Sequence, residues 1–549
     1  MMLRWMPRAR RDLVVLGLMA LASFGTGVHA AATPTAGELL YRRGILLSGR
    51  PAHGEREAGA GVEGADAACS NCHRRSGLGS KEGRNSIPPI TGTYLFMPRT
   101  TSPDDMAVPF VEGARADRDP YTDETLARAI REGIGADGQP LSYLMPRYRL
   151  GDTDMAALVS YLKGMTRAPV PGVTDSVLHF ATIITPDANP VERQGMLDVL
   201  EKYFFDKNAA VRSASPRLYS SRKMMFRVTR QWQLHVWQLT GGPQTWDAQL
   251  RRHLAEEPVF AVISGLGGRT WAPVHHFCEQ QSLPCLFPNV NLPTVEEGDF
   301  YPVYFSKGIL LEARLIAGQI GSQHDSSAPR RLVQIYRSGD VGEEAAGALR
   351  AATGGRGLKF VDRALKHTGG SQELAAALED VGPGDALVLW LRPDDVGSLA
   401  AVPVKAGAVW MSGLMGGLEK SPLPAAWRGA ARMAYPFDLP EQRRVRVDYA
   451  FGWFSIRHIP VVAPQVQADT YLACGLLAET LSHMVDTFVR DYLVERIETG
   501  LEHRIITGYY PRLTLAPGQR FASKGGYIVR FADAVRPKIV AVSDWTIPR

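Results

Sequence analysis

The stretch Cys69-Ser70-Asn71-Cys72-His73 decides how the first part of this sequence folds. Two cysteines three positions apart, followed directly by a histidine, form the pattern by which a c-type haem is attached. On a short helix, residues i, i+3 and i+4 share one face, so Cys69, Cys72 and His73 can converge on one ligand. The thiols would bond to the porphyrin and the imidazole would bind the iron. We therefore predict one covalent haem c, held by Cys69, Cys72 and His73.

The alternatives for the same residues are an incidental cysteine pair and half of a zinc site. A structural zinc site needs four ligands, usually supplied as two Cys/His pairs. No second pair at suitable spacing lies near the motif, which favours haem.

The N-terminus has the features of an export signal. Four arginines, Arg4, Arg8, Arg10 and Arg11, precede an apolar run from Leu13 to Phe24, and Val28-His29-Ala30 offers small residues for cleavage. The apolar run is short for a membrane span. We predict a signal peptide over residues 1–30, a periplasmic location and no membrane span after cleavage; the alternative is an uncleaved anchor.

Length and charge limit the remaining possibilities. The chain has 549 residues, which is enough for two or three domains, and a formal net charge of +6. The predicted signal carries four Arg and one Asp, so a net charge of about +3 remains. This small excess does not indicate a nucleic-acid partner, but a weakly basic face could meet an acidic redox partner.

The sequence around the haem motif resembles class I cytochrome c. Thr35-Ala36-Gly37-Glu38 opens a helix with a capping box, and Gly77-Leu78-Gly79 follows the motif. The resemblance implies an all-α domain in which the first helix crosses a last helix that starts near Asp152. It also implies that a proline carbonyl, here that of Pro88, accepts a hydrogen bond from His73 and so fixes the orientation of the imidazole.

The resemblance further implies a methionine as the sixth iron ligand. Two segments are candidates, because Phe96-Met97-Pro98-Arg99 is similar to Leu144-Met145-Pro146-Arg147. Met145 lies directly before the final helix, where the family has its ligand, so we predict Met145 rather than Met97. Ligation by His73 and Met145 would leave no open position on the iron and suits electron transfer.

Beyond a proline-rich linker the pattern changes to alternating strands and helices. Apolar runs such as Val177–Ile184, Val259–Ser264, Leu332–Tyr336 and Ala386–Leu391 are separated by helical segments. This alternation predicts parallel α/β sheets. Two such runs in series, followed by helices over Val466–Glu498, resemble the type I periplasmic binding proteins of ABC transporters, which have two α/β lobes. A C-terminal β segment is expected to follow.

The resemblance implies a ligand cleft between the lobes, at the carboxyl ends of the strands. The cleft candidates are Ser264, Gly265, Asn289 and Asp340; the alternative is that they are ordinary turn and cap residues. The amino-acid binders of the family have a Ser/Thr-rich loop where this chain has residues 287–291, so the sequence does not favour an amino acid as the ligand.

Three cysteines lie outside the haem motif. Cys278 falls late in a predicted helix and Cys285 in the following strand, and in an exported protein a disulfide between them is plausible. Cys474 would then be a buried free thiol.

These observations predict a signal peptide (1–30), a cytochrome c domain (35–166), a linker (167–175) and a periplasmic binding-protein-like domain (176–549). The leading hypothesis is a non-enzymatic electron carrier with a redox partner protein, whose second domain docks that partner or senses a small molecule. One alternative is a solute-binding or sensor protein with the haem as a redox gauge. Another is a haem-linked oxidoreductase, although no second cofactor site is visible.

Overall fold

The structure is a computed structural model. It describes residues 34–57, 59–82, 85–97, 119–165, 169–213, 230–294, 296–321, 331–354, 358–367, 370–484 and 487–548. The predicted signal peptide lies outside the described residues. The segment from Thr35 to Arg549 forms one structural unit. Within its described residues, no helix combines the length and the apolar character that a membrane span requires.

The first domain is built on a pair of crossing helices, as the sequence predicts. The helices of this domain are α1 (Ala36–Arg43), α2 (Ser70–His73), α3 (Gly92–Phe96), α4 (Asp123–Glu132) and α5 (Asp152–Gly164). Helix α1 begins at Thr35, whose side chain accepts a hydrogen bond from the Glu38 amide at 3.2 Å. At the crossing, a Cβ on Gly37 would lie 2.2 Å from the Ala157 carbonyl oxygen, so only glycine allows this approach. The ring centroids of Tyr41 and Tyr161 lie 5.4 Å apart beside it.

The first domain also contains short strands, although we expected it to be all helical. They are β1 (His53–Glu55), β2 (Gly61–Glu63), β3 (Ser80–Glu82), β4 (Asn85–Ile87) and β5 (Arg147–Tyr148). Strand β1 pairs with both β2 and β5 in antiparallel fashion. These strands have two or three residues each, too few for an alternating pattern to be visible in the sequence. The pairing of β1 with β5 holds the segment before the haem motif against the segment that follows Met145.

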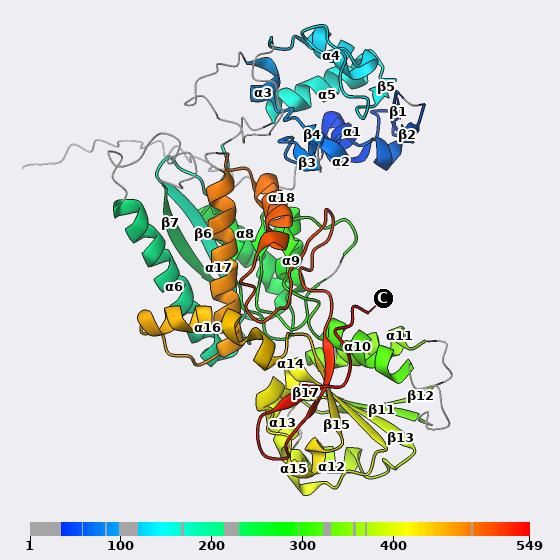
Figure 1. The fold of residues 1–549 in the computed structure, drawn as a ribbon, viewed down its shortest axis with the longest axis vertical. Helices are drawn as coiled ribbons and strands as arrows, with labels where there is room; N and C mark the ends of the chain where they lie inside the picture. The colour runs from blue at the N-terminus through cyan, green and yellow to red at the C-terminus, as the bar shows by residue number, and fades with distance from the viewer. Residues whose placement is uncertain are drawn as a thin grey trace, which may run out of the picture. The chain divides into compact units, whose positions relative to one another are not determined.

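The first lobe of the second domain is a five-stranded, fully parallel sheet in the described residues, with strand order β10-β9-β8-β6-β7. The strands are β6 (Val177–Ile184), β7 (Gln231–Gln238), β8 (Ala261–Ile263), β9 (Cys285–Leu286) and β10 (Pro302–Val303). Helices α8 (Trp246–Glu256) and α9 (Ala272–Gln280) share a hydrophobic cluster with one face of this sheet. Helix α6 (Pro190–Ser213) packs on the other face (Figure 1). Cys278 of α9 and Cys285 of β9 form a disulfide with a Cα–Cα distance of 6.1 Å.

The second lobe is a seven-stranded sheet in the described residues, with strand order β12-β11-β13-β14-β15-β16-β17. The first five strands are parallel: β11 (Arg331–Arg337), β12 (Lys359–Leu365), β13 (Asp385–Trp390), β14 (Ala408–Ser412) and β15 (Ala431–Tyr435). The last two, β16 (Tyr527–Phe531) and β17 (Ile539–Ala541), are antiparallel and form the expected C-terminal β segment.

Helices cover both faces of the second sheet (Figure 1). Helices α10 (Ile309–Gly321) and α11 (Val341–Ala352) pack on one face, and α12 (Ser371–Ala377), α13 (Pro393–Ser398) and α15 (Ala425–Arg428) lie on the other. Alternate residues of β13 divide between the two cores: Val388 joins the cluster of α10 and α11, and Leu387 joins the other. This two-sided burial explains why the strand reads as a continuous apolar run.

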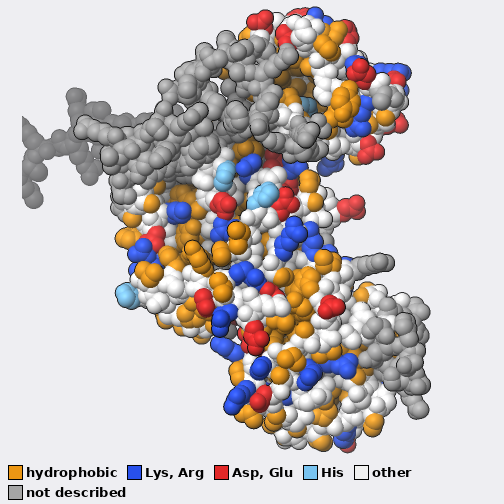
Figure 2. All heavy atoms as spheres, viewed as in Figure 1, with side chains coloured by type: hydrophobic (Ala, Val, Ile, Leu, Met, Phe, Trp, Pro, Cys, Tyr) orange, Lys and Arg blue, Asp and Glu red, His pale blue; other side chains and the backbone are white. Residues whose placement is uncertain are grey.

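The chain returns to the first lobe before it ends. After β15 it forms α16 (Pro440–Ile456), α17 (Pro464–Met484) and α18 (Arg490–Gly500), and then passes back to β16. Helix α17 packs against α6, so the return helices complete the first lobe. The short helix α14 (Gly413–Gly416) follows β14. Two α/β lobes joined in this way are the predicted periplasmic-binding-like architecture. On the face drawn in Figure 2, acidic and basic side chains are interspersed, as the small net charge suggests.

Candidate functional site

The haem motif forms one turn of helix. The His73 amide donates to the Cys69 carbonyl at 2.9 Å, and the Cys72 amide donates to the same carbonyl at 3.3 Å. Among the described residues, the one disulfide joins Cys278 and Cys285, so Cys69 and Cys72 are not paired with each other. Burial raises the pKa of the Cys69 thiol to about 12. Cys69 and Cys72 thus lie within one helical turn, as thioether formation with a porphyrin requires.

The imidazole of His73 is oriented so that its Nε2 can bind a metal. The side chain is 7% exposed, and its Nδ1 lies 3.0 Å from the Pro88 carbonyl oxygen. This bond fixes the tautomer with the proton on Nδ1 and leaves Nε2 as the ligand atom. Burial lowers the pKa of His73, which favours the neutral imidazole that a metal requires. The predicted contact between His73 and Pro88 is thus present, and the donor set fits a covalent haem.

The two candidate methionines differ in their surroundings. Met145 is partly buried and packs against the hydrophobic cluster of the first domain. Its amide donates to the Ser142 carbonyl at 3.0 Å, in a turn that leads into β5. Met97 follows α3 and is 50% exposed. Met145 thus packs into the first domain, whereas the Met97 side chain is half exposed.

A cavity of about 570 Å³ lies between the two lobes, at the carboxyl ends of their strands. From the first lobe, Asp187 follows β6, Gly241 follows β7 and Arg269 follows β8; from the second, Asp340 follows β11. This is the position at which parallel α/β sheets bind ligands.

Two carboxylates of the cavity, those of Asp187 and Asp340, are each paired with an arginine of their own lobe. Asp187 accepts hydrogen bonds from the Arg269 amide at 2.9 Å and from the Thr185 hydroxyl at 2.7 Å. Asp340 caps α11 and accepts from Arg392 Nε at 2.6 Å. Burial opposes ionisation of Asp340, but its bonds to Arg392 outweigh that effect and lower its pKa. The walls therefore present ionised carboxylates and guanidinium groups, which suit a polar ligand.

Only one of the four predicted cleft residues lines this cavity. Asp340 lines the cavity, whereas Ser264, Gly265 and Asn289 are not among its lining residues. Ser264 is fully buried, and its hydroxyl lies 2.8 Å from that of Thr470 on α17. Asn289 donates to the same serine at 3.0 Å. A Cβ on Gly265 would lie 2.4 Å from the Trp271 ring. These three residues sit at strand ends, as expected, but pack against helices.

A second group of polar residues joins the first domain to α18. This helix presents three carboxylates at positions i, i+4 and i+7, from Asp491, Glu495 and Glu498. They contact arginines and a serine of the first domain, which are separated from them by more than 400 positions in the sequence. We refer to Asp491, Glu495 and Glu498 as the acidic face of α18.

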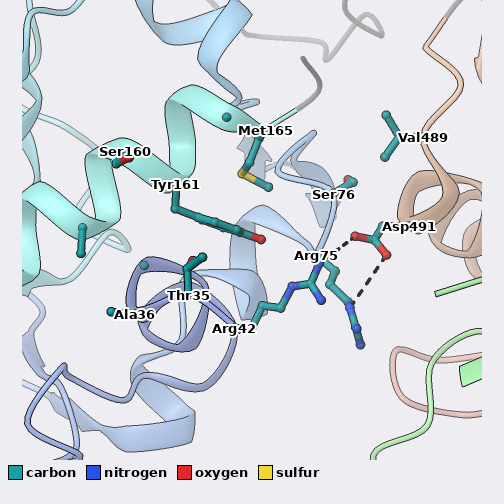
Figure 3. A pocket seen from close by; sticks show the side chains of 13 residues that line it. Thr35, Ala36, Arg42, Arg75, Ser76, Ser160, Tyr161, Met165, Val489 and Asp491 are labelled. Atoms are coloured by element: carbon teal, nitrogen blue, oxygen red, sulfur yellow. Dashed lines mark hydrogen bonds and ion pairs between the residues drawn. The ribbon is translucent and has the colours of Figure 1, made fainter. Parts of the chain in front are cut away.

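Asp491 binds two arginines of the first domain (Figure 3). It accepts from Arg42 at 3.2 Å, and Arg75 Nε lies 3.9 Å from its other oxygen. Tyr301 donates to Asp491 at 2.5 Å, and the Arg75 guanidinium lies 4.4 Å from the centroid of the Phe300 ring. Asp491, Arg42 and Arg75 border a cavity of about 500 Å³ that is also lined by residues of α1 and α5.

The contacts of Glu495 and Glu498 are almost entirely buried. Glu498 is 3% exposed and accepts from both Arg74 and Arg520. Glu495 is 4% exposed and accepts two hydrogen bonds from Ser76. Leu78 is 2% exposed and belongs to the hydrophobic cluster of the second domain. The turn that follows the haem motif is thus anchored in the second domain.

The sequence interpretation missed the acidic face of α18. Its signal was the spacing of three acidic residues within the helix Arg490–Gly500, which places them on one side. The arginines on either side of the haem motif were a matching signal. Nothing in the local sequence indicates which surface those carboxylates meet.

Comparisons with known proteins find different matches for the two parts of the chain. Residues 58–166 match the sequence model of the cytochrome c family. This part of the chain is a cytochrome c domain, and it is joined to a two-lobed α/β body. No curated protein matches the chain in sequence.

Solved structures resemble the body at low sequence identity. A fatty acid ABC transporter substrate-binding protein from Thermomonospora curvata is 16% identical, with a TM-score of 0.48, and the match covers 69% of this chain and 95% of that one. A leucine-binding protein from Thermotoga maritima is 10% identical, also with a TM-score of 0.48, over 68% of this chain and 99% of that one. A substrate-binding periplasmic protein from Ralstonia solanacearum is 12% identical, again with a TM-score of 0.48, over 66% and 99%.

Proposed function

We propose that this chain is a periplasmic mono-haem c-type cytochrome that carries single electrons, and that its body binds a small molecule or docks a partner protein. The observation that carries the proposal is the helical turn Cys69–His73 with the bond from His73 to the Pro88 carbonyl. The sequence contains one such motif, which supports one haem per chain. The export signal supports the periplasmic location.

Each residue of the site has a distinct role in this proposal. Cys69 and Cys72 would hold the porphyrin covalently, and His73 and Met145 would bind the iron. A bound haem supplies one-electron chemistry by cycling between ferric and ferrous iron. With both His73 and Met145 as ligands, the iron would keep no position for a substrate. The site therefore supports an electron carrier rather than an enzyme.

Absorption spectra of the full chain test this proposal. The ferric protein should show a low-spin haem with a methionine-sulfur charge-transfer band. Met145→Ala should abolish that band and lower the midpoint potential, because the thioether ligand raises it. Met97→Ala is the matched control and should leave both unchanged. Loss of the band in Met97→Ala alone would contradict the assignment of Met145.

A second candidate function is ligand sensing by the body, and the cavity between the lobes favours it. Its walls come from both lobes, so a ligand there would contact Asp187 and Arg269 on one side and Asp340 on the other. Thermal unfolding of the full chain with L-leucine or with a fatty acid tests this function, since those are the ligands named for two similar structures. A ligand at 100 times its Kd adds about 2.7 kcal/mol of stability. An Arg269→Ala variant that responds equally to the same ligand would exclude this cavity as its site.

A further inference from the structure

Glu495 of the body holds the turn that follows the haem motif. Its Oε1 accepts from the Ser76 amide at 2.9 Å, and its Oε2 accepts from the Ser76 hydroxyl at 2.5 Å. The Ser76 hydroxyl oxygen in turn accepts from the Leu78 amide at 3.2 Å. Both oxygens of a carboxylate of the second domain are thus used to fix one turn of the first.

That turn leads directly back to the predicted iron ligand. The Gly79 amide donates to the His73 carbonyl at 3.1 Å. Gly79 also packs on the segment that carries the acceptor for the imidazole, because a Cβ at this position would lie 2.1 Å from the Ile87 carbonyl oxygen and 3.0 Å from that of Pro88. Pro88 accepts the hydrogen bond from His73 Nδ1. A continuous set of contacts therefore links Glu495 to the orientation of His73.

We propose that Glu495 is a positioning residue for the haem: acting through Ser76 and Gly79, it holds the bond between His73 and Pro88 and so tunes the midpoint potential. The inference rests on the proposed function, since it assumes a haem at His73. It assigns to the binding-protein body a direct influence on the redox chemistry of the cytochrome domain.

The charge on Glu495 gives this role a measurable signature. The titratable and charged groups that face it are Arg74 and Tyr41 from the first domain and Asp491 and Tyr492 from its own helix. Arg74 is already paired with Glu498, so it neutralises Glu495 only in part. Burial raises the pKa of the Glu495 carboxyl to about 7. Protonation removes a negative charge beside the turn that follows the haem motif and would favour the reduced, less positive iron of a bound haem, so the potential should fall as pH rises through this value.

Spectroelectrochemical titration of the full chain, from about pH 5 to about pH 9, tests the inference on either side of this pKa. The wild-type potential should fall with rising pH and then level off. Glu495→Gln should give a potential that is independent of pH across this range and no lower than the wild-type value at low pH. Glu502→Gln, at a side chain that is about half exposed, is the matched control and should behave as the wild type.

A Glu495→Gln variant that keeps the wild-type pH profile would overturn the inference. If that variant does not fold, Ser76→Ala replaces it. Removing the hydroxyl that favours the ionised carboxylate should move the inflection to higher pH, and an unmoved inflection would overturn the inference. A wild-type chain without any covalent haem spectrum would instead contradict the proposed function, so the two failures are distinguishable.

Discussion

Truncation of Leu78 should loosen the contact between the cytochrome domain and the body. Leu78 belongs to the first domain but is 2% exposed within the hydrophobic cluster of the second. It borders a cavity together with Leu476, Tyr492 and Ile497 of α17 and α18. Replacing a buried leucine by alanine costs about 2–5 kcal/mol. Because the lost contact joins the two domains, we expect most of this cost to fall on their docking.

The Ser76 amide reports on this docking directly. It is buried and donates to Glu495 across the contact, so its hydrogen exchange requires the two domains to separate or the turn to open. A loss of 2 kcal/mol corresponds to roughly a 30-fold faster exchange. Hydrogen-exchange mass spectrometry of a peptide that covers this turn measures the effect in Leu78→Ala.

A leucine of the same domain that is exposed provides the control. Leu47 is 60% exposed, and Leu47→Ala should leave the exchange of the Ser76 amide unchanged. The haem spectrum of both variants should remain that of the wild type. Exchange at Ser76 that is equally slow in Leu78→Ala and in the wild type would refute the reasoning, since the apolar anchor would then contribute nothing to docking.

Three further predictions concern stability and the haem environment. Replacing both Cys278 and Cys285 by serine should cost the body about 2–3 kcal/mol in chemical denaturation, as expected from closing a loop with a sequence separation of 7; an unchanged midpoint would contradict this. Burial raises the pKa of Asp469 to about 7, so the folded state binds this proton more tightly than the unfolded one. The free energy of unfolding should therefore fall as the pH rises from about 4 to about 7, by at most about 1.4 kcal/mol per pH unit. Urea titrations at several pH values should show a flatter slope for Asp469→Asn. Gly79→Ala should displace the backbone that accepts the hydrogen bond from the ligand histidine and shift the midpoint potential, whereas Gly138→Ala, at a glycine with nearly the same φ and nothing within 4 Å of its Cβ, should not.

The helical turn that carries the proposed haem site could be predicted because its information is local. Cys69, Cys72 and His73 lie within five consecutive residues, and one helical turn brings them together. The cap at Thr35 and the apolar runs of the parallel strands are equally local, and the helix and strands they predicted are present, although the structure shows only the Thr35 half of the predicted capping box. The disulfide could be predicted for the same reason, since its cysteines are seven positions apart.

The contacts of the acidic face of α18 were not predictable in this way. The partners Ser76 and Glu495 are 419 positions apart, and no periodicity in the sequence records such a pairing. The prediction for Ser264 and Asn289 shows the same limit. Their strand ends were placed correctly, but the packing of Thr470 from a helix some 200 residues away was not visible. Local sequence patterns predict the individual helices and strands. The contacts between these elements depend on how α17 and α18 pack after the chain has returned to the first lobe.

The central claim is that Cys69 and Cys72 carry one covalent haem in an exported electron carrier. Intact mass spectrometry of the full chain, expressed with its export signal and denatured before analysis, tests that claim most directly. We predict a mass that exceeds that of the polypeptide without its signal by one haem, and a Cys69→Ala, Cys72→Ala double variant that lacks this addition. A wild-type chain with the bare polypeptide mass, or with a second haem, would contradict the account.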